Sequence, residues 1–172
     1  MRVSISSLGQ DSHRFDSKPK PLILAGCEIE GAQGLSGNSD ADVLFHALTN
    51  AVSGLSGEPF LGPPADALCQ KGISDSRIYL EQALNRLYEL RPGCQLTHLS
   101  CSIEAKKPRL FEHLPRLRAS LAQVLHLTEK QVALTATTGE GLTGQGRGEG
   151  IQVLCILSAT VDLEDASCDA LE

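Results

Sequence analysis

Three side chains in the first third of the sequence have the residue types and spacing of a metal site. Asp11 and His13 are two positions apart in a segment with strand character, so their side chains project to the same side. His46 lies about one turn into a predicted helix that begins at residues 39–42, and it brings a second imidazole from a separate element. Three protein ligands with a fourth position open are typical of catalytic zinc. In the alternative interpretation, Asp11 caps a turn and both histidines are ordinary.

A second candidate site is the glycine-rich segment 137–150. It holds six glycines in twelve residues, together with Thr137, Thr138, Glu140 and Arg147. Such a segment lets backbone N–H groups approach phosphate oxygens, while hydroxyls donate further hydrogen bonds and a carboxylate can hold Mg²⁺. The alternative is a plain loop rich in turns, because the order of residues is not that of a Walker loop.

A third feature is a short basic run that follows a predicted strand. Lys106, Lys107 and Arg109 are three cations in four residues, interrupted by Pro108. Taken alone, such a run is more often a solvated loop than a binding site.

Alternating and helical apolar patterns predict the elements that carry these residues. Strand character is expected at Val3 and Ile5, at 96–104 and at 132–137, and a hairpin is expected to close near Ala25-Gly26. Apolar stripes predict helices from residue 43, after a cap at Ser74 or Asp75, and from Pro115. Strands and helices interleave, which predicts one compact α/β domain over residues 1–172.

Two further segments carry specific expectations. Residues 53–72 contain four glycines and three prolines, so they cannot form one long regular element, and a mobile loop is predicted. Residues 151–161 are apolar on both faces, which predicts a central strand covered from two sides.

Composition excludes several classes of protein. The formal net charge is −6, which argues against a nucleic-acid or anionic-membrane binder. No apolar run is long enough to span a membrane and the first residues do not resemble a signal peptide, so a cytoplasmic protein is expected. The six cysteines are scattered, which favours reduced, mostly buried thiols.

Six spaced segments together resemble one enzyme family. They are Asp11-Ser-His-Arg-Phe15, Ser39-Asp-Ala-Asp-Val43 ahead of His46, Lys71-Gly72 with Asp75-Ser76, Ala105-Lys-Lys-Pro108, Ala136-Thr-Thr-Gly-Glu140 and Gly146-Arg-Gly-Glu-Gly-Ile151. Nearly the whole chain is similar to 2-C-methyl-D-erythritol 2,4-cyclodiphosphate synthase.

The resemblance implies a fold and a reaction. The expected subunit is α+β or α/β, with a mixed four-stranded main sheet, helices on one face and a small N-terminal hairpin. Three subunits would form a homotrimer whose sheets face the three-fold axis, where a cavity could take an isoprenoid diphosphate. The enzyme would be a phosphorus–oxygen lyase that converts a cytidine diphosphate derivative of methylerythritol 2-phosphate into the cyclic diphosphate and CMP.

The resemblance also assigns roles to residues. Asp11, His13 and His46 would bind one Zn²⁺ per subunit, and Glu140 would hold Mg²⁺, or Mn²⁺, on the diphosphate. Thr138 would orient a phosphate, and Arg147 would pair with Glu149 near the trimer axis. The remaining expected substrate-binding residues are Asn38, Ser39, Asp66, Ala105, Lys106, Lys107, Pro108, Arg109 and Thr137.

Several positions depart from the family pattern. Asn38 stands where a histidine is usual and Asn50 where an aspartate is usual, while Gly144 and Gln145 replace a phenylalanine and a threonine. The loop 53–72 lacks the usual carboxylate runs, and Asp66 is the candidate for the remaining one. Two other functions stay open: a zinc-dependent phosphohydrolase, and a non-catalytic trimer that binds isoprenoid phosphates.

Overall fold

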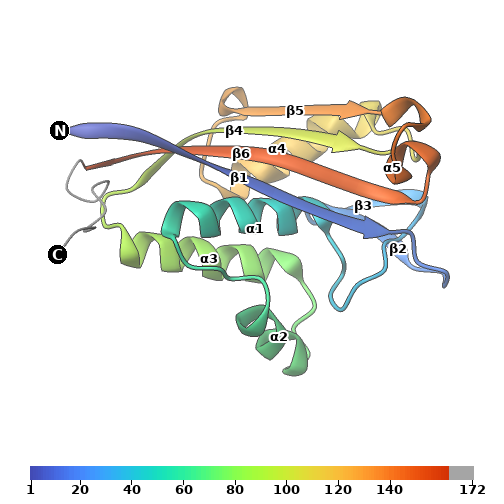
Figure 1. Cartoon of the computed structure of the whole chain (residues 1–172), viewed down its shortest axis with the longest axis horizontal. Helices are drawn as coiled ribbons and strands as arrows, with labels where there is room; N and C mark the ends of the chain where they lie inside the picture. The colour runs from blue at the N-terminus through green and yellow to red at the C-terminus, as the bar shows by residue number, and fades with distance from the viewer. Residues whose placement is uncertain (163–172) are drawn as a thin grey trace.

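A mixed four-stranded sheet forms the centre of the computed structural model, which describes residues 1–162 (Figure 1). The strand order is β1-β6-β4-β5. β1 (Arg2–Arg14) and β4 (Gln95–Glu104) both run antiparallel to β6 (Gly150–Asp162), and β5 (Val132–Thr137) runs parallel to β4. β1 and β5 are therefore the two edges of the sheet, and β6 is central as predicted.

A hairpin outside the main sheet pairs β2 (Pro21–Leu24) with β3 (Cys27–Gln33). Its turn lies at Ala25-Gly26, where both residues have positive φ angles, 49° and 69°. Left-handed backbone is costly for alanine. The buried carboxylate of Asp42 accepts hydrogen bonds from both turn N–H groups, at 3.0 and 2.6 Å, and so stabilises this turn.

The helices lie on one face of the sheet (Figure 1). α1 (Val43–Ser56) packs on β1 and β6, α3 (Ser76–Leu90) packs on α1, and α4 (Leu114–Val124) packs near β5. Asp42 and Asp75 are the N-caps of α1 and α3, and each accepts a backbone N–H of the first turn. Short helices complete the chain: η1 (Phe111–His113), η2 (Glu129–Gln131), η3 (Gly139–Gly141) and α5 (Gly144–Arg147).

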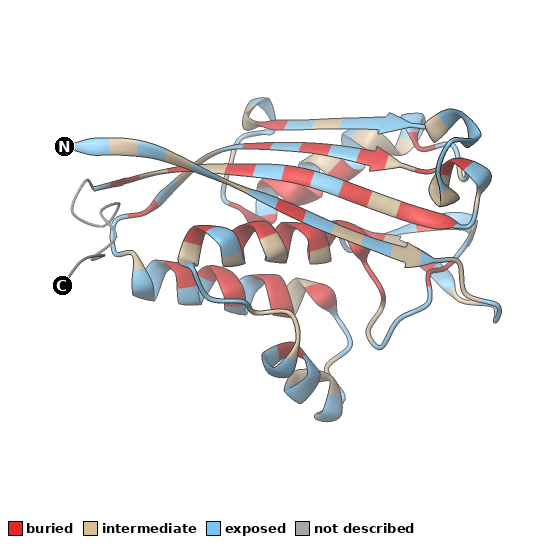
Figure 2. Ribbon diagram, viewed as in Figure 1, coloured by how far each residue is buried: buried red, intermediate tan, exposed pale blue. Residues whose placement is uncertain are grey.

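The inner and outer faces of the sheet differ in burial, as Figure 2 shows by alternating colours along β6. Val153 and Leu157 are fully buried against the helices, whereas Leu154 and Ile156 on the other face are 40% and 48% exposed. Within a single chain the apolar run therefore has a helix layer on one face only, and the second cover expected for 151–161 stays a prediction.

Residues 53–72 are not one loop, so that prediction is wrong in part. α1 continues to Ser56 and ends at Gly57, whose φ is 82°, and α2 (Pro63–Gln70) follows after a six-residue connection. Two prolines occupy the first turn of α2, where the missing N–H groups have no helical partner to lose. Here proline begins a helix instead of preventing one.

Two expectations from composition can be compared with the described residues. Within 1–162 no helix is both long and apolar enough to cross a membrane. The cysteines of this range are free thiols, buried at Cys94, Cys101 and Cys155 and half-buried at Cys27 and Cys69. Cys168 lies outside the described residues.

Candidate metal centre

The ends of β1 and α1 bring three ligand atoms together. Nε2 of His13 lies 2.8 Å from Oδ2 of Asp11, and Nδ1 of His46 lies 3.1 Å from the same oxygen and 3.1 Å from Nε2 of His13. All three side chains are half-buried. Within residues 1–162 this is the one group of three or more His, Cys, Asp or Glu side chains that could hold a metal ion.

A hydrogen bond on the side of the His13 ring away from Asp11 determines which ring nitrogen faces the other two ligands. Nδ1 of His13 lies 2.9 Å from the carbonyl oxygen of Ser36. A carbonyl can only accept, so Nδ1 carries the proton and Nε2 turns a lone pair toward Asp11 and His46. A lone pair and a carboxylate oxygen 2.8 Å apart repel unless a cation or a proton lies between them. The residues therefore fit a divalent cation.

The pKa values of the metal-free site agree with this geometry. Burial opposes ionisation of Asp11, but hydrogen bonds from His13 and His46 outweigh it and lower the pKa of Asp11 to about 2. The hydrogen bond to Asp11 raises the pKa of His13 above its ordinary 6.5, against the opposing effect of burial. A proton on His13 thus compensates the carboxylate when no cation is bound.

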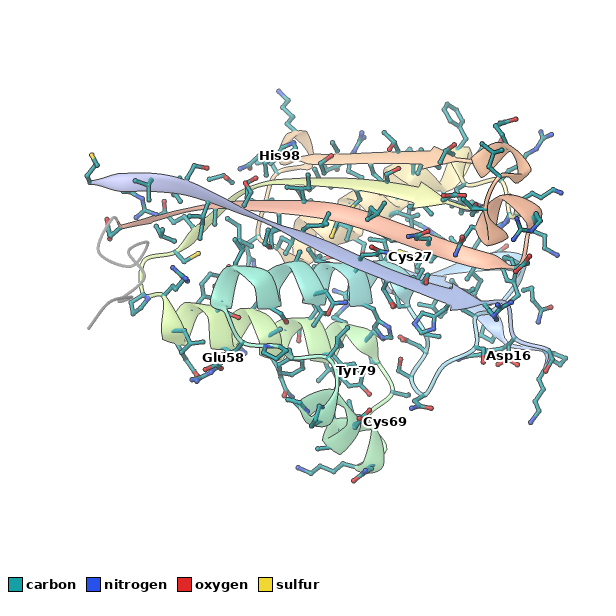
Figure 3. The ribbon with its side chains drawn as sticks, viewed as in Figure 1. Asp16, Cys27, Glu58, Cys69, Tyr79 and His98 are labelled. Atoms are coloured by element: carbon teal, nitrogen blue, oxygen red, sulfur yellow. The ribbon has the colours of Figure 1, made fainter. Side chains whose placement is uncertain are left out.

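The loop before α1 places the other expected residues of this end. Oγ of Ser39 lies 3.3 Å from Nε2 of His46, and the Ser39 carbonyl accepts from Nζ of Lys20 at 3.0 Å. The side chain of Asn38 is exposed. The backbone carbonyl of Asn38 accepts a hydrogen bond from the thiol of Cys69 at 3.1 Å. Cys69 belongs to α2 and is labelled in Figure 3, so α2 contacts the loop that flanks the metal centre.

A second group of expected residues gathers at the opposite edge of the sheet. A cavity of about 210 Å³ is lined by parts of the segment 105–114 and of the end of β5. The expected binding residues among its lining are Ala105, Lys106, Pro108, Arg109, Thr137 and Thr138. Lys107 does not line it, because its ammonium lies 5.3 Å from the centre of the Phe15 ring instead.

Glu140 lies on the glycine-rich loop beside this cavity. Its φ is 49°, and its Oε1 accepts the hydroxyl of Thr138 at 2.6 Å. The cluster of Asp11, His13 and His46 does not include it. A cation at Glu140 would therefore need most of its ligands from a bound anion or water.

The two groups are separated by the width of the sheet. Ser12, beside Asp11, is in register with Gln152, which pairs with Glu104, which pairs with Thr137. Three strand spacings of about 4.8 Å place β1 and β5 roughly 14 Å apart. Within one chain, the metal ligands and Thr138 therefore lie at opposite edges of the sheet.

Two expected residues belong to neither group. Asp66 is exposed in the first turn of α2. Arg147 lines a cavity of about 420 Å³ next to His13, and its guanidinium pairs with Glu149 of the same chain at 3.0 Å. Arg14 also contacts Glu149, at 3.4 Å.

Known proteins resemble this chain in sequence along most of its length. The family model described as the YgbB family matches residues 3–160. The 2-C-methyl-D-erythritol 2,4-cyclodiphosphate synthase of Chlamydia trachomatis serovar A is 46% identical over 154 residues, which cover 88% of this chain and 85% of that protein. The chain belongs to this synthase family. A second member, from Chlamydia muridarum, is 42% identical over the same share of the chain.

Solved structures of the synthase family share the fold. The bifunctional IspDF from Campylobacter jejuni superposes with a TM-score of 0.85 and 31% identity over 94% of this chain. The chain spans 43% of that longer protein. A synthase structure in a form bound to CDP has a TM-score of 0.76 and 27% identity, and the match covers 90% of this chain and 99% of the other.

Sequence reasoning missed part of the site. The hydroxyl of Ser76 lies 2.9 Å from Nε2 of His46, and the Ser36 carbonyl holds His13. Asp75-Ser76 stands in one of the motif segments, so the signal for Ser76 was present, but a helix cap explained it equally well. Nothing in the sequence distinguishes the carbonyl of Ser36.

Proposed function

We propose that the chain converts 4-diphosphocytidyl-2-C-methyl-D-erythritol 2-phosphate into 2-C-methyl-D-erythritol 2,4-cyclodiphosphate and CMP. The observation that carries this proposal is the convergence of Asp11, His13 and His46 in a chain 46% identical to a named synthase. It makes the chain a phosphorus–oxygen lyase.

The proposed zinc ligands are Asp11, His13 and His46, with one ion per subunit. Two imidazoles and one carboxylate are a donor set that zinc uses in catalytic sites. A zinc ion bound there supplies charge that screens the approach of two phosphate groups and an open position for a phosphate oxygen. The outer hydrogen bonds of the histidines hold the ligands in place without needing the ion.

The proposed nucleotide site is the cavity at Ala105–Arg109, supported by the synthase structure described as bound to CDP. Lys106 and Arg109 supply positive charge in a chain of net charge −6. Thr138 would donate to the diphosphate from the loop at the end of β5. Magnesium, or manganese, is assigned to Glu140, since these ions take one or two carboxylates and obtain the rest from phosphate and water.

The reaction needs positioning and charge but no side-chain nucleophile. An oxygen of the 2-phosphate attacks the β-phosphorus, the bond from that phosphorus to the bridging oxygen breaks, and CMP leaves with the bridging oxygen. The attacking phosphate oxygen is already anionic, so no general base is required. Holding both phosphate groups in line converts the step into a favourable intramolecular one.

A homotrimer would complete the site. Leu8, Leu154 and Ile156 form an apolar patch on the outer sheet face, with Leu8 63% exposed and in register with Ile156. Burying this patch between three sheets would remove it from water. The separation of the metal ligands from Thr138 within one chain supports a site shared between neighbouring subunits.

The cavity on the axis could take an isoprenoid diphosphate, and the enzyme is expected in the cytoplasm.

Subunit mixing tests the shared site. His46→Ala removes a metal ligand and Thr138→Ala removes a phosphate donor, so each homotrimer should be nearly inactive in CMP release. Unfolding and refolding the two chains together should restore part of the activity, because some interfaces then pair an intact metal centre with an intact Thr138. Mixtures no more active than either parent would contradict sharing, and an inactive unmodified chain would contradict the proposed reaction.

A further inference from the structure

Ser76 lies between a metal-ligand histidine and a carboxylate. It is the first residue of α3, its side chain is fully buried, and its Oγ is 2.9 Å from Nε2 of His46. The same Oγ is in close contact with Oδ1 of Asp40, and the Ser76 backbone N–H donates to Oδ2 of Asp40 at 3.2 Å. Asp40, Ser76 and His46 thus form one chain of hydrogen bonds that ends at the metal centre.

The direction of these hydrogen bonds follows from the chemistry of each group. A serine hydroxyl has one proton, and a carboxylate oxygen can only accept. The Ser76 proton is therefore donated to Asp40, which leaves Oγ of Ser76 to accept from Nε2–H of His46. A neutral imidazole with its proton on Nε2 has a lone pair on Nδ1, the atom that faces Asp11 and His13.

We propose that Ser76, held by Asp40, is a positioning residue that sets the tautomer of His46 and so prepares Nδ1 to bind the metal. The inference rests on the proposed metal centre and adds a residue to it. Outer hydrogen bonds of this kind orient metal-binding histidines and tune their affinity. The carbonyl of Ser36 has the same effect on His13 at 2.9 Å.

Ser39 is the competing hydroxyl. Its Oγ lies 3.3 Å from Nε2 of His46 and accepts the backbone N–H of Ala41 at 3.1 Å. Its Oγ also lies 3.3 Å from Oγ of Ser76, and neither contact is with a carboxylate, so its proton can be donated to Nε2. Without the Ser76 hydroxyl, His46 would adopt both tautomers, and the one with Nδ1–H has no lone pair for the metal.

The position of Ser76 also connects the metal centre to α2. Ser76 follows the segment that joins α2 to α3, and the carbonyl of Ser74 accepts the backbone N–H of Asp40 at 2.9 Å. Figure 3 labels Cys69 and Tyr79 in this region. The hydroxyl of Tyr79 donates to the Ile73 carbonyl at 2.5 Å, which holds the same connection. The start of α3 is therefore fixed before any metal binds.

The test compares two variants of the full chain. Ser76→Ala removes the acceptor, and Ser120→Ala removes a similar buried hydrogen bond, from Oγ to the Ala25 carbonyl at 2.6 Å, in α4. The zinc dissociation constant is measured with a competing chelator. Ser76→Ala is expected to weaken zinc binding by about 10- to 100-fold, while Ser120→Ala leaves it near the unmodified value. Equal zinc affinity in Ser76→Ala and the unmodified chain would overturn the proposal.

A second measurement does not depend on how well a variant folds. Long-range proton–nitrogen spectra of the unmodified, zinc-loaded chain at about pH 8 report which ring nitrogen of His46 carries the proton. The expected result is a proton on Nε2, and a proton on Nδ1 would overturn the assignment. An unmodified chain that binds no zinc at all would instead contradict the metal centre itself, so the two failures are distinguishable.

Discussion

Gly9 of β1 lies directly against the backbone carbonyl of Ala47 in α1, so closely that a Cβ at Gly9 would be 2.0 Å from that oxygen. Gly9 precedes Asp11 by two residues and Ala47 follows His46, so this contact sets the distance between the two elements that carry the metal ligands. Strand and helix can approach this closely only because the side chain is absent.

Gly9→Ala should therefore separate β1 from α1. We expect a loss of at least about 1–3 kcal/mol in the free energy of unfolding, together with a large loss of zinc affinity. Chemical denaturation and chelator competition measure the two effects. Gly31→Ala is the control, since its Cβ meets nothing within 4 Å and it reports only the cost of a positive φ. Normal zinc binding by Gly9→Ala would show that the contact does not position the site.

Asp42→Asn tests the cap that fixes the start of α1. Oδ1 of Asp42 accepts from Leu44 and Phe45, and Oδ2 accepts from Gly26 at 2.6 Å. An amide nitrogen in place of one oxygen would face an N–H group, so we expect a loss of about 1–3 kcal/mol in the free energy of unfolding.

The size of that loss should depend on pH. Burial raises the pKa of Asp42 to about 6 from 3.8. Because the folded value is the higher one, the stabilisation is full below pH 3.8 and is lost as pH rises through about 6. The difference in unfolding free energy between the unmodified chain and Asp42→Asn should therefore shrink over this range. A difference that is constant with pH would contradict a buried Asp42 carboxyl with a raised pKa.

Zinc binding should weaken as the pH falls. Asp11 raises the pKa of His13 above 6.5, so the protonated form stabilises the metal-free fold fully below pH 6.5 and that stabilisation is lost as pH rises through the folded pKa. The metal requires the neutral ring, so protons compete with it. Zinc titrations at about pH 8, 7 and 6 should show falling affinity. Affinity that is independent of pH would exclude His13 as a ligand.

Glu140→Gln should separate the two metals. An amide is a poorer ligand for a hard cation, so turnover that depends on magnesium should fall about 10²-fold while zinc content stays at one ion per chain. Glu30→Gln, an exposed glutamate on β3, is the matched control. Equal loss of zinc and turnover in Glu140→Gln would mean that Glu140 supports the fold or the zinc site.

Much of the fold could be predicted because local signals agree with the packing. The turn at Ala25-Gly26, the cap at Asp75 and the central position of β6 follow from residue type and apolar pattern alone. Strand periodicity predicts that the side chains of Asp11 and His13 project to the same side of the strand. In the structure Nε2 of His13 lies 2.8 Å from Oδ2 of Asp11.

What failed depended on contacts that one sequence does not encode locally. The sequence pattern does not predict α2, because proline and glycine usually interrupt helices, whereas Pro63 and Pro64 occupy a first helical turn. Ser36 and Ser76 reach the histidines only after strand, loop and helix have packed.

The most direct test of the proposed reaction uses 4-diphosphocytidyl-2-C-methyl-D-erythritol 2-phosphate with zinc, magnesium and the full chain in ¹⁸O-labelled water. Mass spectrometry of the products then separates cyclisation from hydrolysis. The predicted result is one CMP and one cyclic diphosphate for each substrate consumed, with no ¹⁸O in either product. Linear phosphate products that carry ¹⁸O from solvent would contradict the account and indicate a metal-dependent phosphohydrolase.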